Sequence, residues 1–255
     1  MGGSEILQDK VAIVTGSASG LGASIARALA EQHAQVVINY RGGGDEAEKL
    51  VKSLHRSGPA ARAIRADVTD ESQARLLVDR TIEAFGRLDI LVNAVGSFSW
   101  KPVSEMDYLE WRAVLASNLD SVFHVCRLAV PHMRKARFGR IVNLGSVGAE
   151  LSCGQPRTAA FSAAKAGVVA FSRALALEEA RNGITVNVVS PGIFTTEDAA
   201  AQGPAEPASA HPEDRVPVGR VGSHADVVRA VLFFLDPGAD FVTGQVLAVS
   251  GGGRS

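Results

Sequence analysis

Short runs of almost continuous apolar residues alternate along the whole chain with longer stretches of helical pattern. An apolar run without polar alternation is typical of a strand that is covered on both faces, as in a parallel sheet. Sequential strand–helix–strand units with right-handed crossovers build an open sheet with helices on both faces. We therefore predict an α/β fold, a Rossmann-like, doubly wound parallel sheet of about seven strands in a single domain over residues 1–255. The predicted strands cover residues 11–15, 35–40, 61–67, 90–93, 140–146, 184–190 and 245–250.

The charge balance argues against binding to polyanions. The 255 residues hold 26 Lys and Arg against 27 Asp and Glu, a formal net charge of −1. Nucleic acids and anionic membranes attract cationic surfaces, which this balance does not favour. No apolar run approaches the roughly 18 residues that span a bilayer. We expect a cytoplasmic protein that binds neither nucleic acid nor membrane.

The cysteines and histidines lack the spacing of metal ligands. Cys126 and Cys153 are the only cysteines, and we interpret both as free thiols in a reducing compartment. No metal site is predicted. The histidines interpreted as structural or solvated are His33, His55, His124, His132 and His224.

The first predicted strand leads directly into a glycine-rich turn and then into a helix. Residues 15–22 read Thr-Gly-Ser-Ala-Ser-Gly-Leu-Gly. Such a turn brings backbone N–H groups close to a pyrophosphate, and the helix N-terminus behind it adds partial positive charge. A turn that needs glycine without holding a ligand is the alternative. The strand before it and the helix after it favour a dinucleotide site.

This TGxxxGxG spacing resembles the cofactor loop of the short-chain dehydrogenase/reductase family, and the similarity continues over nearly the whole chain. Residues 93–96 read Asn-Ala-Val-Gly where that family usually has NNAG, and residues 190–192 read Ser-Pro-Gly, as in the loop that caps the nicotinamide. The C-terminal part looks most like the 3-oxoacyl-carrier-protein reductase branch. The cofactor-binding residues that the resemblance implies are Gly16, Ser17, Ser19, Gly20, Leu21, Gly22, Asn39, Tyr40, Arg41, Asp67, Val68, Asn93, Ala94, Gly96, Lys165, Pro191, Gly192, Ile193, Thr195 and Thr196.

The end of the second predicted strand bears on the choice of cofactor. An acidic residue there would bond the ribose 2′-OH of NAD and repel a 2′-phosphate. This chain reads Asn39-Tyr40-Arg41 instead, and an arginine fork pairs well with phosphate. We predict NADPH as the cofactor, with a solvated surface role for Arg41 as the alternative.

The family's YxxxK motif appears here as Phe161-Ser162-Ala163-Ala164-Lys165. The resemblance implies that Asn118, Ser146 and Lys165 are catalytic-site residues and that Phe161 occupies the position of the tyrosine that protonates the developing alkoxide. Phenylalanine has no proton to donate, and general-acid assistance is worth about 10²–10⁴ in rate. Another acid would have to replace the phenol in an ordinary ketone reduction, and the candidates are Ser146, a water held by Lys165 and Asn118, or His211.

An iminium substrate removes the need for that proton, because its carbon already carries positive charge. We therefore favour hydride transfer to an iminium or carbinolamine (hemiaminal) of alkaloid or secondary-metabolite kind. Phe98, Trp100, Ser146 and Phe161 are predicted to line its pocket, and residues 196–219, which contain four prolines, are predicted to form a lid or substrate loop. The alternatives are a ketone or 3-oxoacyl reductase, using another acid or disabled by an engineered tyrosine-to-phenylalanine change, and a non-catalytic NADPH-binding module.

The helical stretches around 104–136 and 161–182 are richer in Ala, Val and Leu than one sheet-facing stripe requires. In the family these helices form a dimer interface, and the last strand helps to complete a tetramer. We expect a homo-oligomer, a dimer or tetramer, that acts on a small molecule.

Overall fold

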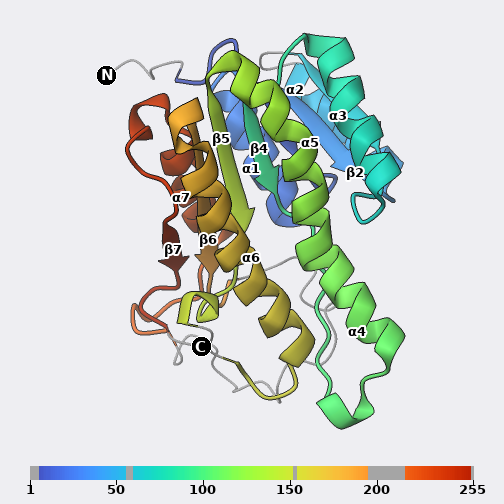
Figure 1. Ribbon diagram of the computed structural model, residues 1–255, viewed down its shortest axis with the longest axis vertical. Coiled ribbons are helices and arrows are strands. Elements are labelled where there is room, and N and C mark those ends of the chain that lie inside the picture. The colour runs from blue at the N-terminus through green and yellow to red at the C-terminus, as the bar shows by residue number, and fades with distance from the viewer. Residues whose placement is uncertain (1–5, 56–59, 152–153, 195–215, 254–255) are drawn as a thin grey trace.

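A parallel sheet of seven strands runs through the centre of the computed structural model, which describes residues 6–55, 60–151, 154–194 and 216–253 (Figure 1). The strand order is β3-β2-β1-β4-β5-β6-β7, and every pair of neighbours is parallel. The strands are β1 (Val11–Val14), β2 (Gln35–Tyr40), β3 (Ala61–Arg65), β4 (Ile90–Asn93), β5 (Gly139–Leu144), β6 (Ile184–Pro191) and β7 (Val246–Val249).

Helices cover both faces of the sheet and build a separate apolar core on each. One core joins the sheet to α1, α2 and α7, and the other joins it to α3, α5 and α6. In Figure 1, α5 and α6 cross in front of the sheet, and α4 extends beyond its edge. The helices are α1 (Gly20–Glu31), α2 (Gly44–His55), α3 (Glu71–Phe85), α4 (Tyr108–Leu115), α5 (Ser121–Ala136), α6 (Ala159–Glu179) and α7 (His224–Leu235).

The predicted fold class and all seven predicted strands are confirmed, and the differences lie at the strand ends. β3 ends at Arg65 and β5 at Leu144, so Asp67 and Ser146 lie in the loops that follow instead of closing the strands. A parallel strand stops where its neighbour no longer offers backbone partners, and the sequence pattern does not mark that point.

The chain reverses its direction of winding at β1, which has β2 on one side and β4 on the other. Open α/β sheets bind their ligands at such a switch point, outside the carboxyl ends of the strands. Gly16 follows β1 there with a φ of +61°, and a Cβ on Gly22 would lie 2.5 Å from the carbonyl oxygen of Gly16. Gly16 is therefore favoured by its positive φ, and Gly22 is restricted to glycine by the close approach of the backbone.

Two helical stretches are long and apolar enough to cross a membrane by length and composition alone, Tyr108–Ala136 and Ala159–Asn182. The first stretch is this long because α4 and α5 continue into each other through a π-helical segment, Ala116–Asp120, and it includes charged residues such as Arg127, so it is not a continuous apolar run. Both stretches contribute buried side chains to the core between the helices and the sheet, among them Val125 and Val168. Core helices of globular proteins commonly have this composition.

Candidate active site

The carboxyl ends of β1, β4, β5 and β6 open into a cavity of about 640 Å³ beside α6, which we call the larger cavity. Its position is the one at which open parallel sheets bind ligands. The predicted site residues that line it are Gly16, Ser19, Gly20, Leu21, Gly22, Ala94, Gly96, Phe98, Asn118, Ser146, Phe161, Lys165, Pro191 and Gly192.

An adjoining cavity of about 600 Å³ shares Gly16 and residues 94–97 with the larger one and extends toward the ends of β2 and β3. The two form one elongated hollow along the carboxyl edge of the sheet, a shape that suits a dinucleotide. The predicted site residues in the adjoining cavity are Gly16, Asn39, Arg41, Asp67, Val68, Ala94 and Gly96.

The first turn of α1 has the features of an anion-binding site. Ser19 is its N-cap but makes no side-chain cap hydrogen bond, and the first turn contains no acidic residue. The initial N–H groups of a helix have no partner within the helix, and the helix dipole adds positive charge. Since Gly20, Leu21 and Gly22 line the larger cavity, a diphosphate there would meet these N–H groups.

Asn39 holds the strand ends around the glycine-rich turn together. Its Oδ1 accepts a hydrogen bond from Gly16 N at 3.2 Å, and its Nδ2 donates to Ala66 O at 3.0 Å. The side chain is 1% exposed. Asn39 therefore supports the loop geometry as well as lining the adjoining cavity.

Arg41 and Asp67 face each other across the adjoining cavity as an ion pair, with Nη1 3.5 Å from Oδ2. Partial burial raises the pKa of Asp67, but hydrogen bonds from Thr69 and the charge of Arg41 outweigh it and bring the pKa below its ordinary value. The Arg41 side chain is 76% exposed, so it is free to turn toward another anion. Arg65 approaches the same segment, where its Nε donates to Arg41 O at 3.2 Å.

Asn118 and Lys165 converge on the backbone of Gly96. A Cβ on Gly96 would lie 2.4 Å from Asn118 Oδ1 and 3.5 Å from Lys165 Nζ. The Asn118 amide donates to Ser97 O at 2.7 Å, while its buried Oδ1 has no hydrogen-bond partner within the described ranges. Lys165 Nζ donates to Leu144 O at 2.7 Å, and burial lowers its pKa to about 8.

Aromatic rings form one wall of the larger cavity. The Phe98 ring packs edge to face against Phe161 with centroids 5.0 Å apart, and it stacks on Trp100 at 6.1 Å. Lys165 Nζ lies 5.6 Å from the centroid of the Phe161 ring. The structure therefore brings together the aromatic residues that the sequence suggested, although Trp100 stands behind Phe98 and does not line the cavity.

Some predicted cofactor-binding residues line neither cavity. Ser17 and Asn93 are buried, and their side chains bond within the fold: Ser17 Oγ donates to Val14 O at 2.7 Å, and Asn93 Nδ2 donates to Asn143 Oδ1 at 2.8 Å. Thr195, Thr196, His211, Cys153 and residues 196–215 of the predicted lid lie outside the described residues. The predicted residues that line neither cavity are Ser17, Tyr40, Asn93, Trp100 and Ile193.

Other cavity residues were not predicted. Phe194 lies two residues after the Ser-Pro-Gly loop, so its place near that motif could have suggested it. His224, interpreted from the sequence as structural or solvated, comes from α7, and no local pattern connects it to Ser24 of α1, 200 residues earlier. The unpredicted residues in the two cavities are Gly42, Ala66, Thr69, Val95, Ser97, Ala113, Ala116, Ser117, Leu144, Gly145, Phe194 and His224.

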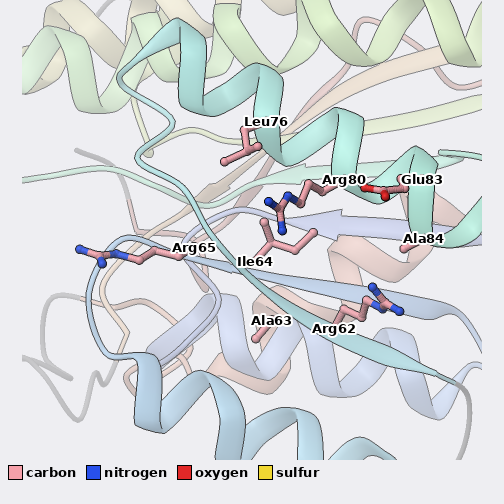
Figure 2. Close-up of a pocket in the computed structure, with 8 residues that line it drawn as sticks. All are labelled: Arg62, Ala63, Ile64, Arg65, Leu76, Arg80, Glu83 and Ala84. Carbon is pink, nitrogen blue, oxygen red and sulfur yellow. The ribbon is translucent and has the colours of Figure 1, made fainter.

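A third hollow, of about 560 Å³, lies on the edge strand β3 and is covered by α3 (Figure 2). Arg62 and Arg80 flank it, while Arg65 points away from both. None of the predicted site residues lines this hollow. Elsewhere in the described ranges, no group of three or more His, Cys, Asp or Glu could hold a metal ion.

A sequence model of the protein family described as "Enoyl-(Acyl carrier protein) reductase" matches residues 16–253. The chain belongs to the short-chain dehydrogenase/reductase family. Members of this family are oxidoreductases that use a nicotinamide cofactor on small molecules. The uncapped first turn of α1 and the elongated hollow formed by the two cavities fit such a cofactor.

Similar proteins cover almost the full length of the chain. It is 40% identical to the cis-4-hydroxycyclohexanecarboxylate dehydrogenase of Sinomonas cyclohexanicum, over 97% of this chain and 98% of that protein. It is 35% identical to the 3-oxoacyl-[acyl-carrier-protein] reductase FabG of Staphylococcus aureus, over 95% of this chain and 97% of that protein. A solved structure of a candidate short-chain alcohol dehydrogenase from Sinorhizobium meliloti 1021 superposes with a TM-score of 0.91 at 31% identity, covering 98% of both chains.

Proposed function

We propose that this short-chain reductase uses NADPH to reduce a C=N carbon, in a cyclic iminium or in the carbinolamine (hemiaminal) that gives rise to it, of alkaloid or secondary-metabolite kind. The observation that carries the proposal is Phe161. It lines the larger cavity one helical turn before Lys165, at the position that the family resemblance gives to the proton-donating tyrosine.

The reaction at an iminium carbon needs no acid from the protein. A bound nicotinamide supplies the hydride that forms the new C–H bond. The π electrons of the C=N bond move to nitrogen, and the product is a neutral amine, so no proton is taken up in this step. For a carbinolamine, the C–O bond breaks first, and the departing hydroxide takes a proton from the Ser146 hydroxyl or from water in the same cavity.

The wall of the larger cavity suits a cationic substrate. The Phe98 and Phe161 rings offer π surfaces that attract cations. Among the described residues that line this cavity, Lys165 is the one Lys or Arg, and there is no Asp or Glu. Burial lowers the pKa of Lys165 to about 8. Near and above that pH the lysine loses its charge, which reduces repulsion of an iminium.

The preference for NADPH over NADH rests on the charges around the end of β2. Arg41 stands there with no carboxylate on β2 itself, and Arg65 is anchored to its backbone. Arg41, Arg65, Asp67 and Gln73 line a small hollow of about 420 Å³ next to the adjoining cavity. Two guanidinium groups at one hollow favour a 2′-phosphate, toward which Arg41 can turn from Asp67.

Deuterium transfer from 4-deuterated NADPH tests the reaction directly. The unmodified chain and Phe161→Tyr are each incubated with a panel of cyclic iminium and carbinolamine compounds and a panel of ketones, and the label is located by mass spectrometry. We expect label in the amine products of the unmodified chain and none in alcohols. Brisk ketone reduction by the unmodified chain, with the C=N panel untouched, would contradict the proposal.

Reduction of a ketone or 3-oxoacyl group is the second candidate, favoured by the names of the relatives. It predicts label in alcohols, either from the unmodified chain through another acid or only from Phe161→Tyr, in which case the phenylalanine is a disabling change. Tight NADPH binding with no transfer in either chain would instead indicate a non-catalytic binding module.

We further propose that the enzyme is a cytoplasmic homo-oligomer, a dimer or tetramer, that pairs through α5 and α6. Phe123 on α5 is 44% exposed and Leu177 on α6 is 81% exposed, which leaves apolar surface uncovered in one chain. Light scattering should give a mass of two or four chains, and a monomer would remove this expectation.

A further inference from the structure

His224 brings an imidazole from the far end of the sequence into the larger cavity. It is the first residue of α7, directly after the N-cap Ser223. The capping box fixes this end of the helix, because Asp226 Oδ2 accepts from both the backbone N and the Oγ of Ser223 at 2.8 Å. The position of the ring is therefore set by a rigid helix start and not by a loose loop.

The ring is tied to the first turns of α1. His224 Nδ1 lies 3.0 Å from Ser24 Oγ, and Ser24 Oγ in turn donates to Gly20 O at 3.2 Å. Since the hydroxyl has one hydrogen and directs it at Gly20, Nδ1 is the donor to Ser24 in this arrangement. The ring also packs against Phe194, with centroids 5.8 Å apart.

The other ring nitrogen is buried without a partner. Nε2 has no hydrogen bond to any atom of the described chain, and it is shielded from water. Buried polar atoms of this kind are uncommon and usually await a water, an ion or a ligand. The cavity that His224 lines also contains Gly20, Leu21 and Gly22, the residues whose N–H groups start α1.

No carboxylate lines this cavity in the described part of the chain, so nothing there competes for the imidazole. The nearest acid along α7, Asp226, is already bonded to Ser223 and Arg220. With its hydrogen on Nδ1, the ring offers only an acceptor at Nε2; in the other tautomer Nε2 can donate to an anion, and the helix N-terminus beside it favours that anion.

We propose that His224 Nε2 donates a hydrogen bond to a diphosphate oxygen of the dinucleotide, adding a side-chain contact from α7 to the backbone contacts of the glycine-rich turn. When the cofactor binds, Ser24 Oγ turns its hydrogen to Nδ1, and the ring hydrogen moves to Nε2 through tautomer exchange with water. This inference rests on the proposed function only in that the ligand is a nicotinamide dinucleotide.

The test compares ligands that contain or lack the diphosphate. Dissociation constants for NADPH and 2′-AMP are measured by calorimetry for the unmodified chain, His224→Ala and His224→Gln, with His132→Ala on α5 as the matched control. A hydrogen bond to a charged group predicts that His224→Ala weakens NADPH binding about 10- to 100-fold. Binding of 2′-AMP should be unchanged, and the amide of His224→Gln should restore most of the NADPH affinity.

NADPH binding by His224→Ala within twofold of the unmodified chain would overturn the inference, and so would an equal loss of NADPH and 2′-AMP affinity, which indicates a general structural defect. The same comparison with NADH and adenosine separates this inference from the proposed function. A chain that binds NADH and not NADPH contradicts the proposed cofactor. The role of His224 is then decided by whether His224→Ala weakens binding of NADH and leaves binding of adenosine unchanged. Binding of neither dinucleotide overturns both.

Discussion

The rings of Phe98 and Phe161 meet edge to face, with their planes at 77°. Phe98 lies in the loop after β4 and Phe161 near the start of α6, so the contact joins two segments that line the larger cavity. Such aromatic pairs contribute about 0.5–1.5 kcal/mol beyond the burial of their surface. The pair holds an apolar wall in place without any hydroxyl group.

Replacing Phe98 by Ala should therefore weaken binding of a cationic substrate and leave the cofactor unaffected. Loss of one cation–π partner predicts an increase in KM for the cyclic iminium of about tenfold. NADPH affinity should stay constant, because Phe98 belongs to the aromatic wall and is not among the residues assigned to the cofactor. Steady-state kinetics with a fluorescence titration of NADPH measures both. Phe241→Ala, at a fully exposed position, is the control, and an equal loss of both affinities in Phe98→Ala would contradict the assignment.

Arg41→Ala should change the cofactor preference. Loss of a charge-assisted contact to the 2′-phosphate predicts a Kd for NADPH that is about 10- to 100-fold higher. NADH, which lacks this phosphate, should bind as well as before, since Asp67 is then free for its ribose hydroxyl. Titrations of both cofactors with Arg41→Ala and with Arg62→Ala, from the separate hollow on β3, give the comparison. Equal losses of NADH and NADPH affinity in Arg41→Ala would show that Arg41 does not bind the 2′-phosphate.

The fold was predictable because each strand and helix carries its own local pattern. The glycine-rich turn and Lys165 were also predictable, since they stand in motifs with fixed spacing, and the family resemblance implied Asn118. His224 was not, because it reaches the cavity through the packing of α7 on α1, which leaves no local trace. The buried roles of Ser17 and Asn93 were equally hidden, since a motif gives the residue type and not the direction of its side chain.

Gly96→Ala should disturb the catalytic end of the cavity. The added Cβ would come 2.4 Å from Asn118 Oδ1, and the Asn118 side chain is held by hydrogen bonds to Ser97 O and Val114 O. Overpacking of this kind typically destabilises by about 1–3 kcal/mol. We expect a lower unfolding midpoint in urea and a lower kcat. Gly154→Ala, which meets nothing within 4 Å, is the control. A Gly96→Ala enzyme with unchanged kcat would show that Asn118 can shift freely.

Lys165 gives the stability of the protein a pH dependence whose sign is fixed by its burial. Burial lowers its pKa from 10.5 to about 8, so between these values the unfolded chain holds a proton that the folded chain has lost. Stability therefore rises as the pH increases from about 8 to 10.5. Below that window the penalty for burying the charge is present in full.

Lys165→Met removes this penalty, and at pH 7 the variant should be more stable by up to ~3 kcal/mol, less the contribution of the lost hydrogen bond to Leu144 O. Urea unfolding at pH 7 and pH 10 should show the advantage shrinking at the higher pH, with the exposed Lys52→Met unaffected at both. A Lys165→Met variant less stable than the parent at both values would show that the hydrogen bond to Leu144 outweighs the burial of the charge.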